Sequence, residues 1–168
     1  CQSGQVKNEN PFFNAYETPH EVPPFHLIKN KHYLPAYEEG MRQHQAEINA
    51  IINNPEAPTF KNTIDALEAS GELLNKVSSV FGNQQGANTN DSIKAIAKKI
   101  TPKLTAHWDA INLNDKLFER IKTVYNNKEK ENLTPEQLTV LDKYYQGFVR
   151  GGANLSPADK EIFKKLNS

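Results

Sequence analysis

Apolar residues recur at three- and four-residue spacings through most of this 168-residue chain, and this spacing constrains the fold more than any other feature. Such a period places apolar side chains along one face of a helix, whereas a half-buried strand needs strict alternation. No convincing alternating segment occurs in the sequence. The pattern therefore predicts an all-α fold, a helical bundle or helical-hairpin array of about six helices with an extended N-terminal arm.

Helix-breaking and helix-capping residues divide this pattern into segments. Asn53-Asn54-Pro55 should end the first helix, because asparagine tolerates a left-handed cap and proline cannot continue the helix. Thr59 should cap a second helix whose apolar stripe runs to Phe81. Gly71 interrupts that stripe, which predicts the close passage of another helix. The polar stretch Gly82 to Asn88 is interpreted as a loop.

The later boundaries rest on the same residue types, and a proline inside the third helix, Pro102, predicts a kink. Aromatic side chains on the stripes are expected in the core rather than on a ligand platform. The predicted boundaries in chain order are Thr89 or Asn90, Asn114, Thr134-Pro135-Glu136-Gln137, Gly151-Gly152 and Ser156-Pro157. The aromatic residues concerned are Phe81, Trp108, Tyr144, Tyr145 and Phe148.

The N-terminal stretch lacks helical periodicity and is rich in proline. We interpret residues 1–24 as a flexible tether followed by an extended arm, and residues 25–168 as a helical lobe. The aromatic side chains of the arm could wrap the body of the lobe. These are Phe12, Phe13 and Tyr16.

Cys1 is the single cysteine, which excludes an internal disulfide and any site built from several cysteines. Mature bacterial lipoproteins begin with an acylated cysteine followed by a small, polar tether, and the residues after Cys1 match that description. We therefore expect Cys1 to be a lipidation site and the protein to be lipid-anchored at the periplasmic face of a bacterial envelope. The alternative is a chain boundary that falls at this cysteine by chance.

Charge composition excludes one class of partner. Lys plus Arg and Asp plus Glu each total 20, so the formal net charge is zero, whereas proteins that bind nucleic acid usually carry a basic excess. The nearest basic cluster is interpreted as a solvated helix face, and no nucleic-acid partner is expected. It consists of Lys94, Lys98, Lys99 and Lys103.

The sequence contains no complete catalytic or metal site. His20 and His26 are six residues apart with two prolines between them, so they cannot meet on one helix as zinc ligands do. His32, His44 and His107 are not paired at helical spacing, and no nucleophile or phosphate-binding motif occurs. The acid pairs Glu38/Glu39 and Glu68/Glu72 could share a proton, but such pairs are usually a solvated face. By site chemistry alone the segment is not an enzyme, and no catalytic residue, metal ligand or cofactor is assigned.

Several blocks resemble one peptidase family in order and spacing. Residues 30–41 (NKHYLPAYEEGM) resemble the opening helix of the bacterial peptidyl-dipeptidase and oligopeptidase A family, which includes mammalian thimet oligopeptidase and neurolysin. Residues 53–71 resemble the segment that follows this helix. Residues 88–91, 102–104 and 148–156 continue the likeness, which runs from about Pro11 to the end.

The resemblance implies a parent zinc metallopeptidase that releases dipeptides from the C-termini of short peptides. This chain would be its non-catalytic N-terminal lobe, forming part of the substrate channel wall, with zinc in the catalytic lobe that this sequence lacks. Apolar side chains should then be exposed where that lobe docks, with Phe148, Phe163 and Leu166 as candidates. Two alternatives stay open: a stand-alone helical peptide-binding or adaptor domain, and a lobe of an oligopeptidase A-type endopeptidase.

Overall fold

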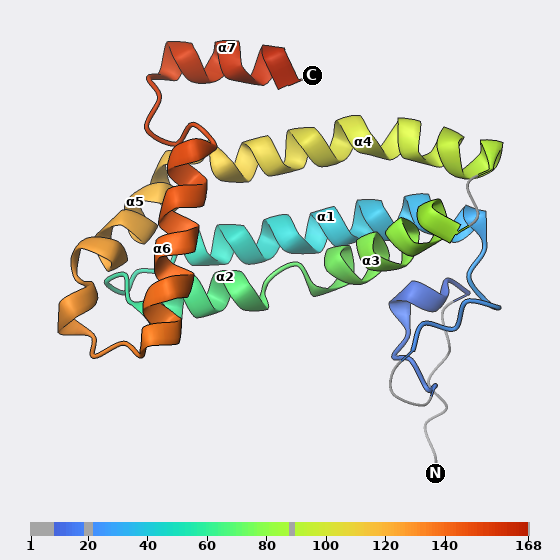
Figure 1. Cartoon of the computed structure of the whole chain (residues 1–168), viewed down its shortest axis with the longest axis horizontal. Coiled ribbons are helices and arrows are strands. Elements are labelled where there is room, and N and C mark those ends of the chain that lie inside the picture. Colours follow the sequence, from blue (N-terminus) through green and yellow to red (C-terminus); the bar gives the residue numbers. More distant parts are fainter. Residues whose placement is uncertain (1–8, 19–21, 88–89, 168) are drawn as a thin grey trace. The chain divides into compact units, whose positions relative to one another are not determined.

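The computed structural model describes residues 9–18, 22–87 and 90–167. Every regular element within these ranges is helical, and the described residues form no strand (Figure 1). The all-α prediction is therefore confirmed. The elements in chain order are η1 (Pro11–Phe13), α1 (Asn30–Ile52), η3 (Phe60–Asp65), α2 (Ala66–Ala69), α3 (Glu72–Ala87), α4 (Asp91–Asn112), α5 (Asp115–Asn126), η4 (Lys128–Lys130), α6 (Pro135–Arg150) and α7 (Pro157–Asn167).

The chain packs as two compact units, each assembled from two stretches of sequence. Unit 1 comprises residues 1–44 and 71–101, and unit 2 comprises residues 45–70 and 102–168. Helices α1 and α4 contribute residues to both units. Each unit has its own buried apolar residues and is described separately.

Unit 1 is built around a chain of aromatic rings. Tyr33 of α1 lies between Phe12 and Phe81, with ring centroids 5.5 Å and 4.9 Å away, and Tyr37 meets Phe81 edge-on at 5.8 Å. Such tilted and edge-to-face contacts add to the free energy gained by burying the rings. Helices α1 and α3 can approach closely because Gly40 has no side chain. A Cβ at this position would lie only 3.0 Å from the backbone of Leu74.

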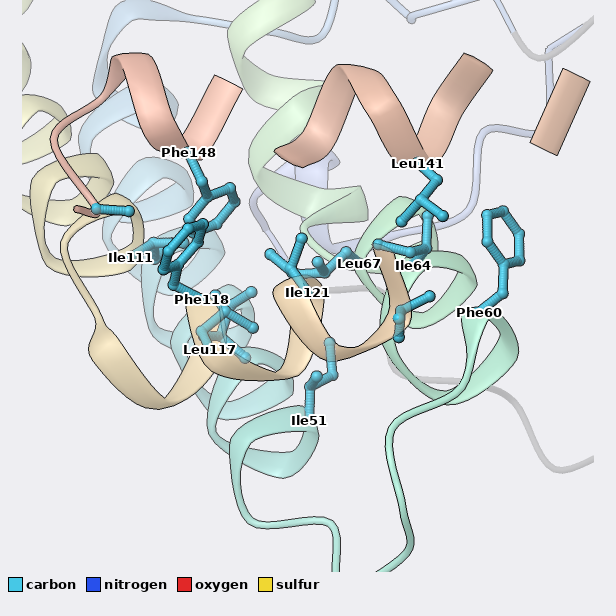
Figure 2. Packing of buried hydrophobic residues seen from close by; sticks show 13 residues of the cluster. Ile51, Phe60, Ile64, Leu67, Ile111, Leu117, Phe118, Ile121, Leu141 and Phe148 are labelled. Carbon is cyan, nitrogen blue, oxygen red and sulfur yellow. The ribbon is translucent and has the colours of Figure 1, made fainter. Parts of the chain in front are cut away.

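Unit 2 has a larger apolar core contributed by α1, η3, α2, α4, α5 and α6. Figure 2 shows Leu141 and Phe148 pointing from α6 toward the side chains of α5, with Ile64 and Leu67 beside them. Leu141 is fully buried in this cluster. The apolar faces of the helices that form this core are thus covered by their neighbours, which supplies most of the stability of helices of this length.

Most predicted helix boundaries are confirmed by cap hydrogen bonds. Thr59 and Thr134 each form a capping box, in which the side chain of the third helical residue accepts a hydrogen bond from the backbone amide of the cap. Asn90 accepts from the Ile93 amide at 3.0 Å, and Asn114 accepts from the Leu117 amide at 2.9 Å. Helix α1 ends before Asn53-Asn54-Pro55. Gly151 caps α6 and Ser156 precedes α7, as predicted.

Two boundaries in the region of the second helix were predicted wrongly. Residues Gly82 to Ala87 continue α3 and do not form a loop, while Asn88 lies outside the described residues. The single helix expected from Thr59 to Phe81 is divided: a π-helical turn leads into α2, and the chain breaks at Ser70-Gly71 before α3. Gly71 has φ +75°, a conformation that costs other residues about 1–2 kcal/mol.

The close approach predicted at Gly71 is confirmed, since a Cβ there would lie 3.1 Å from the imidazole of His44 in α1. Pro102 lies inside α4, which continues to Asn112. The kink expected at Pro102 stays a prediction.

Two expectations about exposure also need correction. Trp108 is 41% exposed rather than buried, because it lies about 80° around the helix from Ile100, whereas Ile111 returns to the buried line. Leu138 of α6 is likewise 39% exposed. Phe148 was a candidate for exposure but is buried in the core of unit 2, while Leu166 is 79% exposed as expected. Phe163 is half-buried.

Candidate functional site

Unit 1 contains a groove of about 1160 Å³. Its walls are the arm from Glu9 to Thr18, the turn around Pro24 to Leu27, and the first residues of α1. Lys29, Lys31 and His32 line it beside Glu9 and Glu17. The groove therefore carries both signs of charge and no arrangement typical of a nucleophile or a metal centre.

The arm that forms one wall is fixed to the helices at two points. Asn10 donates from Nδ2 to the backbone oxygen of His32 at 2.9 Å, and it also caps η1 by accepting from the Phe12 amide. Lys76 of α3 donates to the backbone oxygens of Phe12 and Asn14 at 3.3 Å and 3.0 Å. The same ammonium lies 3.8 Å from the ring centroid of Tyr16. Burial lowers the pKa of Lys76.

His32 is the buried titratable group at the junction of arm and helix. Its side chain is 7% exposed, and its Nδ1 accepts a hydrogen bond from the Lys29 amide at 3.0 Å. An imidazole nitrogen can accept only while it carries no proton, so this geometry selects the neutral form. Burial lowers the pKa of His32, and the nearby Lys31 and Lys29 lower it further, while Glu9 opposes them.

Unit 2 contains a buried arginine that organises a loop. Arg120 of α5 is 9% exposed and donates from Nη1 to the backbone oxygens of Asn54 and Glu56, at 3.0 Å and 3.3 Å. Its Nη2 donates to Asn62 Oδ1 at 3.1 Å. Asn62 in turn donates to the Ala57 carbonyl at 2.9 Å. The loop between α1 and η3 is thus held from its start to its end by one guanidinium group.

The acid pairs do not form proton-sharing sites. Glu39 accepts from Arg42 and Gln43, and these hydrogen bonds lower the pKa of its carboxyl to about 2. Glu68 accepts from the hydroxyl of Tyr144 at 2.5 Å. Burial and the hydrogen bond to this carboxylate raise the pKa of Tyr144. These carboxylates therefore act as partners of neighbouring side chains.

The histidines discussed in the sequence analysis do not assemble a metal centre among the described residues. No group of three or more His, Cys, Asp or Glu side chains with metal-binding geometry occurs among them. His26 is exposed on the groove, and His107 packs edge-on against Trp108. His20 and the predicted lipidation site Cys1 lie outside the described residues.

Sequence reasoning missed the buried polar residues that position the elements. His32, His44, Arg120 and Lys160 are each at most 9% exposed. Lys160 of α7 donates to the backbone oxygen of Leu113 at 3.3 Å and pairs with Asp115. The burial of His44 could have been predicted, because this histidine occupies a position on the apolar face of α1 where an apolar residue would be expected. Arg120 and Lys160 carry no such signal.

Comparison with known proteins relates this all-α chain to peptidases. Dipeptidyl carboxypeptidase of Escherichia coli (strain K12) is 42% identical over 159 residues, which are 95% of this chain and 23% of that protein. Thimet-like oligopeptidase of Dictyostelium discoideum is 25% identical over 80% of the chain and 20% of its own length. Oligopeptidase A of Escherichia coli (strain K12) is 18% identical over 88% of the chain and 22% of its length. No protein-family model matches the chain.

The chain is thus homologous to a segment of the peptidase group that contains oligopeptidase A and the thimet-like oligopeptidases, which confirms the resemblance. Within that group it is similar to the dipeptidyl carboxypeptidases, with 42% and 41% identity to two of them. The chain spans about a quarter (23%) of the length of these two relatives. Among the described residues no helix is both long enough and apolar enough to cross a bilayer.

Proposed function

We propose that this chain is a non-catalytic helical lobe of a zinc metallopeptidase that releases dipeptides from the C-termini of short peptides. In this proposal the lobe forms part of the wall of the substrate channel. The observation that carries it is the 42% identity to a dipeptidyl carboxypeptidase along 95% of the chain. Sequence similarity along nearly all of a helical segment indicates that its packing is also similar. The function of such a segment then depends on the residues that its surface contributes to the active site of the larger enzyme.

In this proposal the described residues support the catalytic site of the enzyme from outside it. They form no group that fits a zinc ion, since no three His, Cys, Asp or Glu side chains converge among them. Zinc in the proposed enzyme would therefore be held by residues outside those described. The buried Arg120 and Lys160 and the half-buried Lys76 each bind backbone carbonyls of this chain, so they fix loops and helix ends.

The proposal is tested on the native protein purified with an antibody raised against unit 2. We expect a polypeptide several times longer than this chain that contains zinc and releases dipeptides from a blocked tetrapeptide, with activity lost in a chelator and restored by zinc. A native polypeptide of about this length that binds peptides without cleaving them would instead establish the adaptor alternative. The same preparation therefore decides between the two.

The products distinguish the two peptidase alternatives. Similarity to oligopeptidase A favours testing internal cleavage as the second candidate activity. We expect a peptide of about ten residues to lose dipeptides successively from its C-terminus, and amidation of that terminus to slow the reaction, because an enzyme of this kind has to recognise the free carboxylate. Internal fragments as first products, with no effect of amidation, would identify an endopeptidase.

We further propose that Cys1 carries a lipid and anchors the protein at the periplasmic face of the bacterial envelope. Support comes from the sequence alone, in which a single cysteine precedes a small, polar stretch. Mass spectrometry of the N-terminal peptide from native membranes should show an acylated Cys1. Detection of the unmodified peptide in the soluble fraction, with none in membranes, would contradict the anchor.

A further inference from the structure

The junction between the arm and α1 depends on an uncharged histidine. The Lys29 amide donates to His32 Nδ1 at 3.0 Å, and the His32 amide donates to the Lys29 oxygen at 2.9 Å. These reciprocal bonds close the first turn of α1. The backbone oxygen of His32 then accepts from Asn10, whose side chain is 7% exposed. The same residue therefore shapes the start of the helix and holds the arm.

Protonation of His32 would break the hydrogen bond from the Lys29 amide to its Nδ1. A protonated Nδ1 becomes a donor and faces the Lys29 amide, which is also a donor. The charged groups acting on the imidazole are the cations Lys29 and Lys31 and the carboxylate Glu9, and two cations outweigh one anion. No described carboxylate forms an ion pair with His32 to compensate for burying its charge, so the protonated ring is expected to turn toward solvent.

We propose that His32 is an acid-sensitive latch that releases the Asn10 end of the N-terminal arm from α1 when its imidazole becomes charged. Lys76 holds the other end of the arm through the backbone oxygens of Phe12 and Asn14. Release at Asn10 would loosen η1 and expose the ring of Phe12, which is 1% exposed when the arm is docked. It would also open one wall of the groove that His32 and the arm line together.

The sign of the effect follows from proton linkage. The folded protein binds a proton at His32 less readily than an unfolded chain does, because the docked imidazole is buried between cations. Arm docking is therefore complete at neutral and higher pH and is lost as the pH falls through the range in which the folded His32 titrates. As the pH falls below the ordinary pKa of histidine, the undocked fraction rises by up to about tenfold per pH unit, until the docked imidazole itself is protonated.

Amide hydrogen exchange of the full chain between pH 7.5 and 4.5, corrected for intrinsic rates, tests the latch. We expect protection of the Phe12, Phe13 and His32 amides to fall by up to about tenfold per pH unit, while the Leu141 amide in unit 2 keeps its protection. The titration of His32 followed by NMR should have the same midpoint. Titration of His32 with no change in arm protection would overturn the proposal.

Variants separate the latch from general acid unfolding. His32→Asn places an amide oxygen where Nδ1 accepts from Lys29 but cannot titrate, so its arm should stay protected throughout the pH range. Asn10→Ala should release the arm at every pH. His26→Asn, on an exposed groove residue, should behave like the natural chain. Equal loss of arm protection in the His32→Asn variant and the natural chain would contradict the latch.

Discussion

At the scale of single residues, Gly71 and Gly82 have opposite structural roles. Gly71 has φ +75° and lies against the His44 imidazole, whereas Gly82 is inside α3 with open space around the position of a Cβ. The first glycine is required by backbone conformation and by packing. The second is a weak point of a helix, because glycine is about 1 kcal/mol less favourable than alanine in a helix interior.

Alanine substitutions at these glycines should therefore change stability in opposite directions. Gly71→Ala is expected to lower the free energy of unfolding by about 1–3 kcal/mol through the left-handed backbone and the contact with His44. Gly82→Ala should raise it by about 0.5–1 kcal/mol. Urea denaturation monitored by circular dichroism gives both values. Similar changes for the two variants would show that the break between α2 and α3 does not depend on Gly71.

Arg120 is a buried cation whose hydrogen bonds all go to neutral oxygens. Arg120→Met keeps the apolar stem but removes the donors to Asn54, Glu56 and Asn62. We expect a loss of about 1–3 kcal/mol in the free energy of unfolding, together with faster amide exchange in residues 54–62. Lys122→Met, on the same helix but exposed, should change stability by less than about 0.5 kcal/mol.

At the scale of elements, α7 differs from the helices of the core. Its apolar side chains are largely outside, with Ile162 57% and Leu166 79% exposed. Its attachment relies on Lys160, which is 6% exposed and reaches the backbone oxygen of Leu113 and the carboxylate of Asp115. A helix held mainly by one polar anchor should open locally before the core does.

Removal of that anchor should release α7 alone. Lys160→Ala is expected to abolish the protection of α7 amides from hydrogen exchange, while the amides of α5 and α6 exchange at unchanged rates. Lys164→Ala is the matched control, because Lys164 forms an exposed ion pair with Glu161 on the same helix, and such pairs contribute little. Unchanged protection in Lys160→Ala would show that the half-buried Phe163 and its neighbours hold the helix without the ion pair.

At the scale of the whole molecule, the two units carry separate apolar cores and no described metal centre. Because burial of these apolar cores stabilises the fold, we predict that folding does not require a metal. We expect the melting temperature of the chain, measured by circular dichroism, to be the same in zinc and in a chelator, in contrast to a zinc-dependent domain whose folding is coupled to binding. A rise in melting temperature with zinc would reveal a site that involves residues outside those described.

The sequence alone was sufficient for the helical class and for most helix ends. Periodic apolar residues act locally, and caps such as Thr59, Asn114 and Thr134 satisfy backbone amides within three residues of themselves, so their effect can be predicted without knowledge of the fold. The family resemblance was also available at this level. The prediction of a loop from Gly82 to Asn88 was wrong because Gln84, Gln85 and Ala87 are good helix formers and continue α3 through Gly82 and Gly86.

Tertiary structure decided which polar residues became buried and where the second helix broke. Gly71, where the helix breaks, packs against His44, which is distant in sequence, and Arg120 binds a loop more than fifty residues away in the chain. Trp108 and Phe148 have similar apolar signatures, yet the first is exposed and the second lies in the core. Periodicity specifies a face of a helix, but only contacts between distant segments determine which part of that face is covered.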